Sequence, residues 1–468
     1  MALSLTITKQ RNLNWLLAIL FLPLVLSYVL PLLFYRIPIR LAATNAVVEF
    51  AGGEILYATM VWVIWIGIAV ITPLLLSRIK PSIGNERPWS LTTLWRGFVV
   101  LSVISGLISP LRYFFSFHSG IEQLLQQLSF APVVAVVLGI RVMQDINLFN
   151  ERRRLRKLLG GVLLLSLNSA NALVLPVLMG RAAPAIYAGL AILYGVHSLK
   201  IERKKLIAIW LVFFTLAGLA LAYKSNFRTS GFGSIFGHHG QYIRIPIMDV
   251  LHGRIREAYR QQTDGRSFDV GKLLSLAEDY SSYDINYYDR IRFFSSDDGI
   301  PEKAKYLIAK TLSRVNHLGE LAYVIRTTPD PVPYLHGSTY YPLLFKPIPR
   351  LFWEDKPEDN SGQIFGHRYG LLNPTDTATS ANMGVVIEAW INGGWTVLVL
   401  SSFAFGMLIY LAWRYLLGES GEIGNIVLGT VFIVSGVTTE SSMNLVAGGI
   451  LYGVLVWWVM EHIIRTKL

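Results

Sequence analysis

The sequence predicts an all-α polytopic membrane protein with about ten transmembrane helices and one large extracytoplasmic loop. Three observations support this fold class. Of the 468 residues, 53% are hydrophobic and only 15% are charged, and the mean hydropathy is +0.46. Apolar stretches recur along the chain, and most have the roughly 17 to 25 residues that cross a bilayer. Lysines and arginines gather at alternate ends of these stretches, as expected when one side faces the cytoplasm.

The apolar stretches divide the chain into three parts. An N-terminal bundle over residues 1–224 and a C-terminal bundle over residues 381–468 enclose a polar loop over residues 225–380. The first stretch is too long for the core of a signal peptide and lacks a small-residue cleavage site, so we interpret it as a retained span. The predicted spans are Leu13–Tyr35, Ile55–Ser77, Leu94–Phe115, Leu128–Met143, Leu158–Met179, Ala182–Leu199, Leu206–Tyr223, Trp395–Tyr415, Ile423–Thr439 and Leu445–Ile464.

The distribution of basic residues predicts the orientation of the spans. Short loops on one side carry only Arg36, Arg40, Arg112 and Arg181, whereas the opposite side carries many more, including the cluster Arg152–Lys157. This bias places both termini in the cytoplasm and the large loop outside. The net charge of +12 therefore reflects membrane topology. Acidic and basic residues balance within the loop, which disfavours nucleic acid as a partner.

No residue pattern predicts a metal ion or another cofactor. The chain has no cysteine, which excludes disulfides and thiolate ligands. His238 and His239 lack partners at metal-ligand spacing. Asp297 and Asp298 imitate the acidic pair of nucleotide-sugar transferases, but nucleotide sugars are cytoplasmic and this pair is predicted outside. We interpret the two aspartates as the start signal of a helix.

That helix is predicted over Pro301–Ile325, where the apolar residues have amphipathic spacing. Arg314 and His317 are separated by three residues, so on such a helix they face one side. The sequence Thr328–Pro331 contains two prolines and ends the helix.

A rigid aromatic segment follows over Gly337–Pro357. Its four prolines disfavour a regular helix and favour extended or polyproline-like backbone. Tyr340, Tyr341 and Trp353 lie among lysine and arginine residues, and ring faces beside fixed cations suit a sugar that carries an anion. The alternative is a well-packed loop with solvated charges.

Four cations and one carboxylate are candidate site residues. Arginine forks match phosphate oxygens, and Arg228 is predicted at the outer membrane–water boundary, where lipid phosphates lie. Glu388 lies where the loop returns to the membrane and is a candidate general base for a sugar hydroxyl, unless it simply marks the aqueous boundary. The remaining candidate cations are Arg314, Arg350 and Lys356.

The same region resembles the Wzy-type polymerases that join oligosaccharide repeat units into bacterial O-antigen and exopolysaccharide. The plan of many spans around a large outer loop is also similar to that of O-antigen ligases and SEDS peptidoglycan polymerases. This chain departs from several of these polymerases because it offers one large outer loop where two are described. The matching residues are Arg314, Asn316, His317, Gly337–Tyr340, Pro349, Arg350, Trp353, Lys356, Pro357, Phe365, Tyr369, Thr379, Ser380, Gly384, Glu388 and Asn392–Gly394.

The resemblance implies an inverting, metal-independent glycosyl transfer on the outer face of a bacterial inner membrane. A glycan on undecaprenyl pyrophosphate is the implied donor and a repeat unit on the same lipid the implied acceptor, with a chain-length-regulating co-polymerase of the Wzz type as a partner. The implied roles are contact with the leaving pyrophosphate by Arg228, Arg314, Arg350 and Lys356, activation of the acceptor hydroxyl by His317 or Glu388, and sugar stacking by Tyr340, Tyr341 and Trp353.

Two other functions remain open at this point. A ligase or another lipid-sugar glycosyltransferase of the same fold transfers a finished glycan to a different acceptor. A transporter of polysaccharide or lipid-linked sugar requires polar residues distributed over many spans. The predicted spans are nearly uncharged, and the polar chemistry is concentrated in the outer loop, which favours a glycosyltransferase.

Overall fold

The computed structural model describes most of the two predicted bundles and the second part of the loop. The described residues are 11–33, 38–79, 89–117, 119–148, 151–178, 182–199, 204, 207–213, 215–217, 237–238, 241–242, 245–246, 316–346, 348, 352–353, 355–357, 359–377, 379–417, 422–438 and 441–466.

Helices dominate the described residues, which confirms a mostly helical membrane protein. The long helices are α2 (Arg11–Leu33), α3 (Gly52–Ile79), α4 (Leu91–Phe114), α6 (Ala131–Gln144), α7 (Glu151–Ser169), α9 (Ala182–Ser198), α19 (Val385–Ala412), α20 (Ile423–Gly436) and α21 (Met443–Thr466). The shorter ones are α5 (Ser119–Gln127), α8 (Leu175–Leu178), α17 (His317–Thr327) and α18 (Ser361–Arg368), the 3₁₀-helices η1 (Leu128–Phe130), η2 (Ile146–Leu148) and η4 (Ser338–Leu344), and the π-helices η3 (Ala170–Val174) and η5 (Trp413–Leu417).

Strands are restricted to three two-stranded ladders of two-residue strands among the described residues. They pair β1 (Ile39–Arg40) with β2 (Val47–Val48), β3 (Phe115–Ser116) with β6 (Ile245–Pro246), and β4 (Gly237–His238) with β5 (Gln241–Tyr242).

Seven stretches of the described chain are long and apolar enough to cross a membrane. They coincide with the predicted spans on α2, α3, α4, α6, α7 to α8, α19 and α21. The stretches Ile207–Ala217 and Ile423–Gly436 are apolar helices of 10–17 residues, and α9 has 17. The total of ten spans therefore stays a prediction.

The eighth predicted span begins ten residues too late. The helix starts at Val385 and continues through Trp395, although the backbone at Gly393 and Gly394 is not helical. The span was predicted to begin directly after Gly393 and Gly394, whereas this glycine pair forms a kink inside α19. The segment that precedes it is therefore part of this membrane helix and carries Glu388.

Two expectations for the loop also require correction. The predicted continuous helix over Pro301–Ile325 is wrong, because the chain is not helical at Asn316. Asn316 caps a helix that starts at His317 and runs to Thr327. The Asn316 side chain accepts a hydrogen bond from the Gly319 N–H, which satisfies one of the amides at the helix start. Residues 301–315 lie outside the described part of the chain.

The aromatic segment is also not extended throughout. Its first part forms η4, which starts after Gly337 in the left-handed region, at φ +85°, and accommodates Pro342. A 3₁₀-turn of this length tolerates proline, which has no N–H to donate, because short 3₁₀ pieces need few backbone hydrogen bonds.

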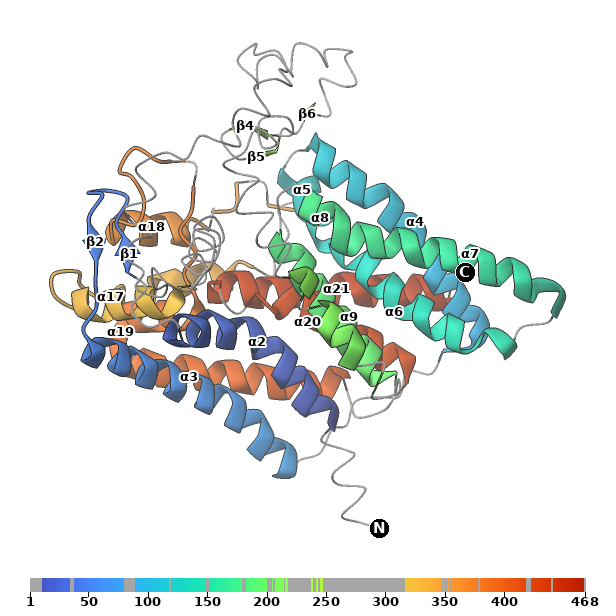
Figure 1. Ribbon diagram of the computed structural model, residues 1–468, viewed down its shortest axis with the longest axis horizontal. Coiled ribbons are helices and arrows are strands. Elements are labelled where there is room, and N and C mark those ends of the chain that lie inside the picture. Colours follow the sequence, from blue (N-terminus) through green and yellow to red (C-terminus); the bar gives the residue numbers. More distant parts are fainter. Residues whose placement is uncertain are drawn as a thin grey trace, which may run out of the picture.

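The helices form two groups joined by a central layer (Figure 1). Helix α3 packs along α19 with α2 beside them, while α4, α6 and α7 form the second group. Helices α9, α20 and α21 lie between the groups. Small residues permit the closest approach, since a Cβ atom at Gly406 of α19 would lie 2.8 Å from the Ala69 carbonyl oxygen of α3.

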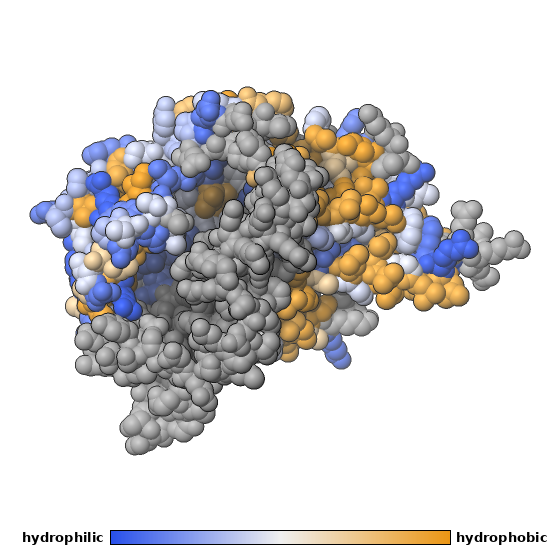
Figure 2. Space-filling model, turned by 90° about the horizontal axis from the view of Figure 1, so that it is seen from above, coloured by the Kyte–Doolittle hydropathy of each residue, from blue (hydrophilic) through white to orange (hydrophobic). Residues whose placement is uncertain are grey.

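The surface has the pattern of a membrane protein. Large apolar side chains are exposed along α3 and α7, including Leu56 and Leu163, both 70% exposed. Figure 2 shows hydrophobic residues gathered in the right-hand part of the molecule, while hydrophilic residues predominate at the left end, where α17 and α18 lie in Figure 1. Lipid tails would cover the apolar surface without leaving polar groups unsatisfied.

Candidate functional site

A buried asparagine in α19 holds η4 against the helix bundle. The Asn392 side chain accepts a hydrogen bond from the Gly337 N–H at 2.9 Å and donates to the Thr339 hydroxyl and the Glu388 carbonyl, each at 2.7 Å. From α21, Asn444 donates to the Thr339 carbonyl at 2.5 Å. The start of the aromatic segment is therefore connected to two membrane helices at once.

Glu388 lies one turn before Asn392 and is completely buried. Its Oε2 atom accepts a hydrogen bond from the backbone N–H of Met443, the first residue of α21, at 2.5 Å. No donor among the described residues reaches Oε1 with good hydrogen-bond geometry. The Thr339 hydroxyl is nevertheless close enough to the carboxylate to interact with its charge. The N-terminus of α21 stabilises a negative charge here and leaves one carboxylate oxygen available.

A cavity of about 150 Å³ adjoins this contact. Ser442, which directly precedes Met443, lies in its wall, whereas Glu388 itself is not among the lining residues. The other lining residues are Asp359, Gly362, Ser380, Ala381, Asn382, Met383 and Leu445.

Tyr340 also belongs to the surroundings of Glu388. Burial, followed by the negative charge of Glu388, raises the pKa of the Tyr340 phenol well above its usual value. Tyr340 is therefore a neutral phenol at physiological pH, and the structure brings these two predicted site residues together.

Lys356 is 7% exposed and its ammonium group contacts backbone carbonyls. Its Nζ atom donates to the carbonyl oxygen of Ile348 at 2.8 Å and lies 3.5 Å from that of Lys346. The Tyr452 hydroxyl of α21 donates to the same two carbonyls, at 3.0 Å for Ile348. Lys356 thus helps to hold the chain around residues 346–348 against α21, and its predicted contact with pyrophosphate stays a prediction.

The contact of Tyr452 with the loop lies far along α21 from the Glu388–Met443 contact. Tyr452 is nine residues after Met443, which corresponds to about 13 Å along a helix axis. Large apolar side chains of this part of the loop are exposed, with Leu344 at 71%, Ile348 at 42% and Phe352 at 79%, and Asp355 is exposed as well. The chain at Lys346 and Ile348 therefore lies against the middle of α21, and the carbonyl groups of these two residues have hydrogen-bond donors.

The aromatic side chains of the segment form a row. The ring centroids of Tyr341 and Phe345 are 4.9 Å apart, and those of Phe345 and Trp353 are 5.6 Å apart, both edge to face. Tyr341 is 60% exposed. Edge-to-face pairs fix the ring orientations, so the row offers preformed apolar faces for stacking.

His317 lies in a different environment, at the start of α17. Its Nδ1 atom is 2.8 Å from Oε2 of Glu320 in the next turn. Its ring stacks on Tyr28 of α2, with centroids 6.3 Å apart, and Tyr28 stacks on Trp62 of α3 at 5.3 Å. His317 is 4% exposed, and these contacts anchor α17 on α2 and α3. Its predicted role in activating a hydroxyl stays untested by this geometry.

Three predicted cationic residues, Arg228, Arg314 and Arg350, lie outside the described residues. Their roles remain predictions. Among the described residues, no group of three or more histidine, aspartate or glutamate side chains is arranged to hold a metal ion.

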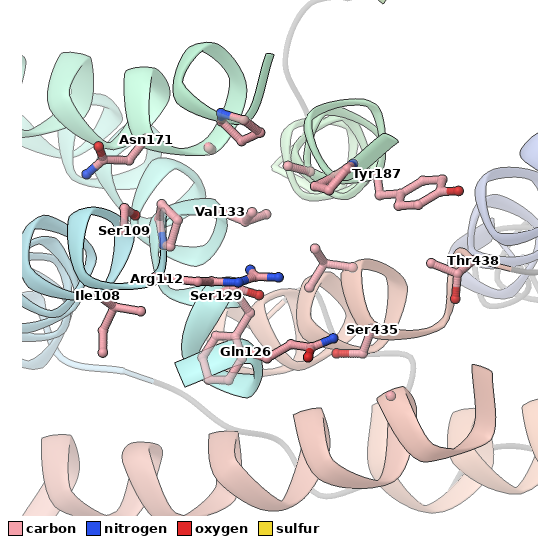
Figure 3. Close-up of a pocket in the computed structure, with 18 of the residues that line it drawn as sticks. Ile108, Ser109, Arg112, Gln126, Ser129, Val133, Asn171, Tyr187, Ser435 and Thr438 are labelled. Carbon is pink, nitrogen blue, oxygen red and sulfur yellow. The ribbon is translucent and has the colours of Figure 1, made fainter. Parts of the chain in front are cut away.

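A second polar cavity lies inside the bundle around Arg112. The sequence had indicated only that Arg112 lies in a short loop on the outer side. The cavity has a volume of about 300 Å³ and contains the side chain of Arg112 from the last turn of α4 (Figure 3). Gln126, Ser129 and Ser435 point into the same space. Leu445 lines both this cavity and the smaller one beside Glu388, so the two lie at the same end of α21.

The sequence did contain a signal for this cavity. Ser102, Ser105, Ser109 and Arg112 are spaced by three, four and three residues in an otherwise apolar span, which places them on one helix face. Asn168 and Asn171 are polar residues within the predicted span Leu158–Met179. Asn171 does line the cavity, whereas Asn168 is completely buried.

No protein-family model, no curated protein and no solved structure matches this chain.

Proposed function

We propose that this protein is a glycosyltransferase that joins lipid-linked oligosaccharide repeat units into a polysaccharide. In this proposal it works on the outer face of a bacterial inner membrane, with both termini in the cytoplasm. The donor and the acceptor are glycans on undecaprenyl pyrophosphate, and a Wzz-type co-polymerase sets the chain length. The resemblance of the loop to Wzy-type polymerases supplies the reaction class.

The observation that carries the proposal is the position of Glu388. A carboxylate buried at the start of a membrane helix is costly and needs a reason to persist. One Glu388 oxygen is held by the Met443 N–H, and a cavity reaches Ser442, the residue before Met443. The row of Tyr341, Phe345 and Trp353 belongs to the aromatic segment Gly337–Pro357 and offers ring faces for sugars.

The proposed reaction is a single displacement. The acceptor hydroxyl oxygen forms a bond to the anomeric carbon of the donor sugar, and the bond from that carbon to the diphosphate oxygen breaks. The polyprenyl diphosphate leaves with the electron pair, while the hydroxyl proton passes to the Glu388 carboxylate. Arg228, Arg314 and Arg350 are the proposed partners of the developing charge on the diphosphate, because cations placed there stabilise the transition state.

The first test replaces Glu388 with glutamine. The glutamine amide oxygen can still accept the Met443 N–H, so we expect the E388Q protein to fold with a nearly unchanged melting temperature. Extension of a defined lipid-linked repeat unit should fall by roughly 10²-fold or more, because a general base is lost.

The matched control for E388Q is Glu461→Gln. Glu461 is 4% exposed in α21, where it accepts from Trp89 and lies 3.5 Å from Arg465. It is thus a buried glutamate of the same bundle at the opposite end of α21, and the E461Q protein should keep its activity. Equal activity of E388Q and wild type would contradict the proposed base.

A second test addresses the loop arginines. Purified protein with Arg314→Gln or Arg350→Gln should give less and shorter polymer from the same repeat unit, with a chelator present throughout. Normal polymer yield and length from both variants would show that these residues do not hold the leaving group.

Analysis of intermediates in cells distinguishes the polymerase from a ligase. Loss of a polymerase leaves single repeats on the final acceptor lipid, whereas loss of a ligase leaves long chains on the carrier.

A further inference from the structure

Arg112 lies in a membrane cavity without an acidic partner among the described residues. Its guanidinium carbon is 5.9 Å from the centroid of the Tyr113 ring, and no described carboxylate is within ion-pair distance of the guanidinium. The residue lies in the last turn of α4, at the end of a predicted span. An ionisable residue that faces a cavity at this depth is a candidate for ligand binding.

The polar face of α4 leads into this cavity. Asn168 donates to the Ser102 hydroxyl at 2.8 Å, and Asn171 donates to the Ser105 hydroxyl at 3.0 Å. These two bonds align the serine face of α4 with α7 and η3. The last polar residue of that face, Arg112, is thereby directed into the space beyond the bonds, where Figure 3 shows it.

The backbone of η3 contributes to the position of Asn171. Residues Ala170–Val174 form a π-helix, which inserts an extra residue into a turn and changes the direction of the side chains that follow. Ala172 and Pro176, at and after this bulge, line the cavity with Asn171.

The lining of the Arg112 cavity matches an anion. It offers one guanidinium group together with amide and hydroxyl groups, and it contains no acidic side chain among the described lining residues. A guanidinium fork binds two phosphate oxygens in parallel, and hydroxyl groups can donate to the others. The polar lining residues other than Arg112 are Ser109, Tyr113, Gln126, Ser129, Asn171, Tyr187, Ser435, Thr438 and Ser441.

An apolar hollow lies on those faces of η3, α8 and α9 that do not line the Arg112 cavity. Its volume is about 450 Å³, and it is lined by apolar residues of η3, α8, α9 and the stretch Ile207–Ala217. Along η3 and α8 the linings alternate: Ala172 and Pro176 face the Arg112 cavity, whereas Leu173 and Val177 face the hollow. A head group and an apolar chain of one lipid would therefore have separate, adjacent surfaces.

We propose that the Arg112 cavity binds the phosphate or diphosphate head group of a lipid whose apolar chain occupies the adjacent hollow. The assignment of this lipid as a polyprenyl diphosphate rests on the proposed function, in which two such lipids must bind together. The cavity would hold one of them at the same end of α21 as the Glu388 site.

The test measures binding by calorimetry to the purified full chain in nanodiscs of zwitterionic phosphatidylcholine. The probes are farnesyl diphosphate, inorganic pyrophosphate, farnesol and phosphatidic acid. The variants are Arg112→Gln and Arg112→Lys, and the matched control is Arg141→Gln. Arg141 lies in the last turn of α6 and pairs with Asp145 at 3.0 Å, so its replacement also removes one guanidinium group from the last turn of a helix.

We expect farnesyl diphosphate to bind to wild type and to R141Q, and the Kd to rise at least tenfold in R112Q and less in R112K. Farnesol should bind weakly to all variants, because it lacks the anion. Equal affinity of R112Q and wild type for farnesyl diphosphate would overturn the inference. It would also be overturned if wild type bound farnesol as tightly as farnesyl diphosphate.

The remaining probes distinguish the sources of the phosphate. Arg112-dependent binding of pyrophosphate as tight as that of farnesyl diphosphate would overturn the lipid assignment in favour of a free phosphate. Arg112-dependent binding of phosphatidic acid at equal affinity would overturn the polyprenyl assignment alone.

Glu440 requires its own variant, because it lies in the sequence between the lining residues Thr438 and Ser441 but outside the described residues. If Arg112 serves only to pair with Glu440, then E440Q should weaken farnesyl diphosphate binding as much as R112Q, and the inference fails. Unchanged or tighter binding by E440Q supports it.

The outcome is separable from that of the proposed function. Wild type that extends lipid-linked repeats while R112Q binds farnesyl diphosphate normally refutes the cavity alone. Arg112-dependent binding by a protein that extends no repeat refutes the polymerase alone.

Discussion

At the scale of residues, one buried amide connects three parts of the candidate site. Asn392 uses both ends of its side chain, accepting from Gly337 and donating to Thr339 and to the Glu388 carbonyl. A buried polar group left without its partner costs roughly 1 to 3 kcal/mol, more than the net gain of a typical hydrogen bond. The geometry around Glu388 therefore depends on a residue with no chemical role of its own.

We predict that Asn392→Ala lowers the stability of the detergent-solubilised protein by about 1 to 3 kcal/mol, because the Gly337 N–H and the Thr339 hydroxyl lose a partner. Thermal unfolding followed by circular dichroism measures the effect. Asn14→Ala is the matched control, since Asn14 is exposed on α2. A melting temperature for N392A equal to that of N14A would contradict this account.

At the scale of elements, the kink in α19 decides how the site joins the membrane helix. Gly394 has φ +55° and ψ −136°, a conformation that residues with a side chain rarely adopt. A Cβ atom there would also lie 2.7 Å from the Tyr334 hydroxyl oxygen. The kink lets the helical turn that carries Glu388 and Asn392 meet the loop, while the rest of α19 packs along α3.

We predict that Gly394→Ala destabilises the protein by about 1 to 3 kcal/mol through backbone strain, with the contact to Tyr334 in addition. Gly67→Ala is the matched control, because Gly67 lies within α3 and a Cβ there meets no atom within 4 Å. Combining Gly394→Ala with Tyr334→Phe should restore only the part of the stability that the hydroxyl contact removes. Full recovery in the double variant would show that the backbone is not strained.

At the scale of the whole molecule, both polar cavities lie at one end of a bundle whose sides are apolar. The turn between α20 and α21 contributes residues to each cavity, and Leu445 lines both. The positive-inside distribution predicts that this end faces the outside of the cell, which is the side where lipid-linked glycans would be joined.

The absence of cysteine allows a direct test of this orientation. Thr375→Cys, in the exposed turn after α18, should react with a membrane-impermeant maleimide in intact cells. Asn147→Cys, exposed in η2 between α6 and α7, should react only after permeabilisation. The unsubstituted chain gives no background. The reverse pattern would place the candidate site in the cytoplasm and exclude the proposed reaction.

Local patterns determined the class of the protein and most of its helices. Apolar length predicts a span because each backbone polar group in a bilayer must be satisfied within its own helix, and this requirement leaves a signal in a single stretch of sequence. The helical break after Thr327 has an equally local cause, because two prolines follow within four residues. The predicted start of the eighth span at Trp395 was wrong because the glycine pair before it marks a turn or a kink equally well.

The partners across the chain were decided only by the tertiary structure. Glu388 meets the amide of Met443, 55 residues away, and Lys356 meets two carbonyls beside a hydroxyl of α21. The serine and arginine face of α4 is visible in the sequence, but the space that it faces depends on how α6, α9, α20 and α21 pack around it. A sequence states which side chains share a helix face, whereas packing between helices decides whether that face meets lipid, another helix or a cavity.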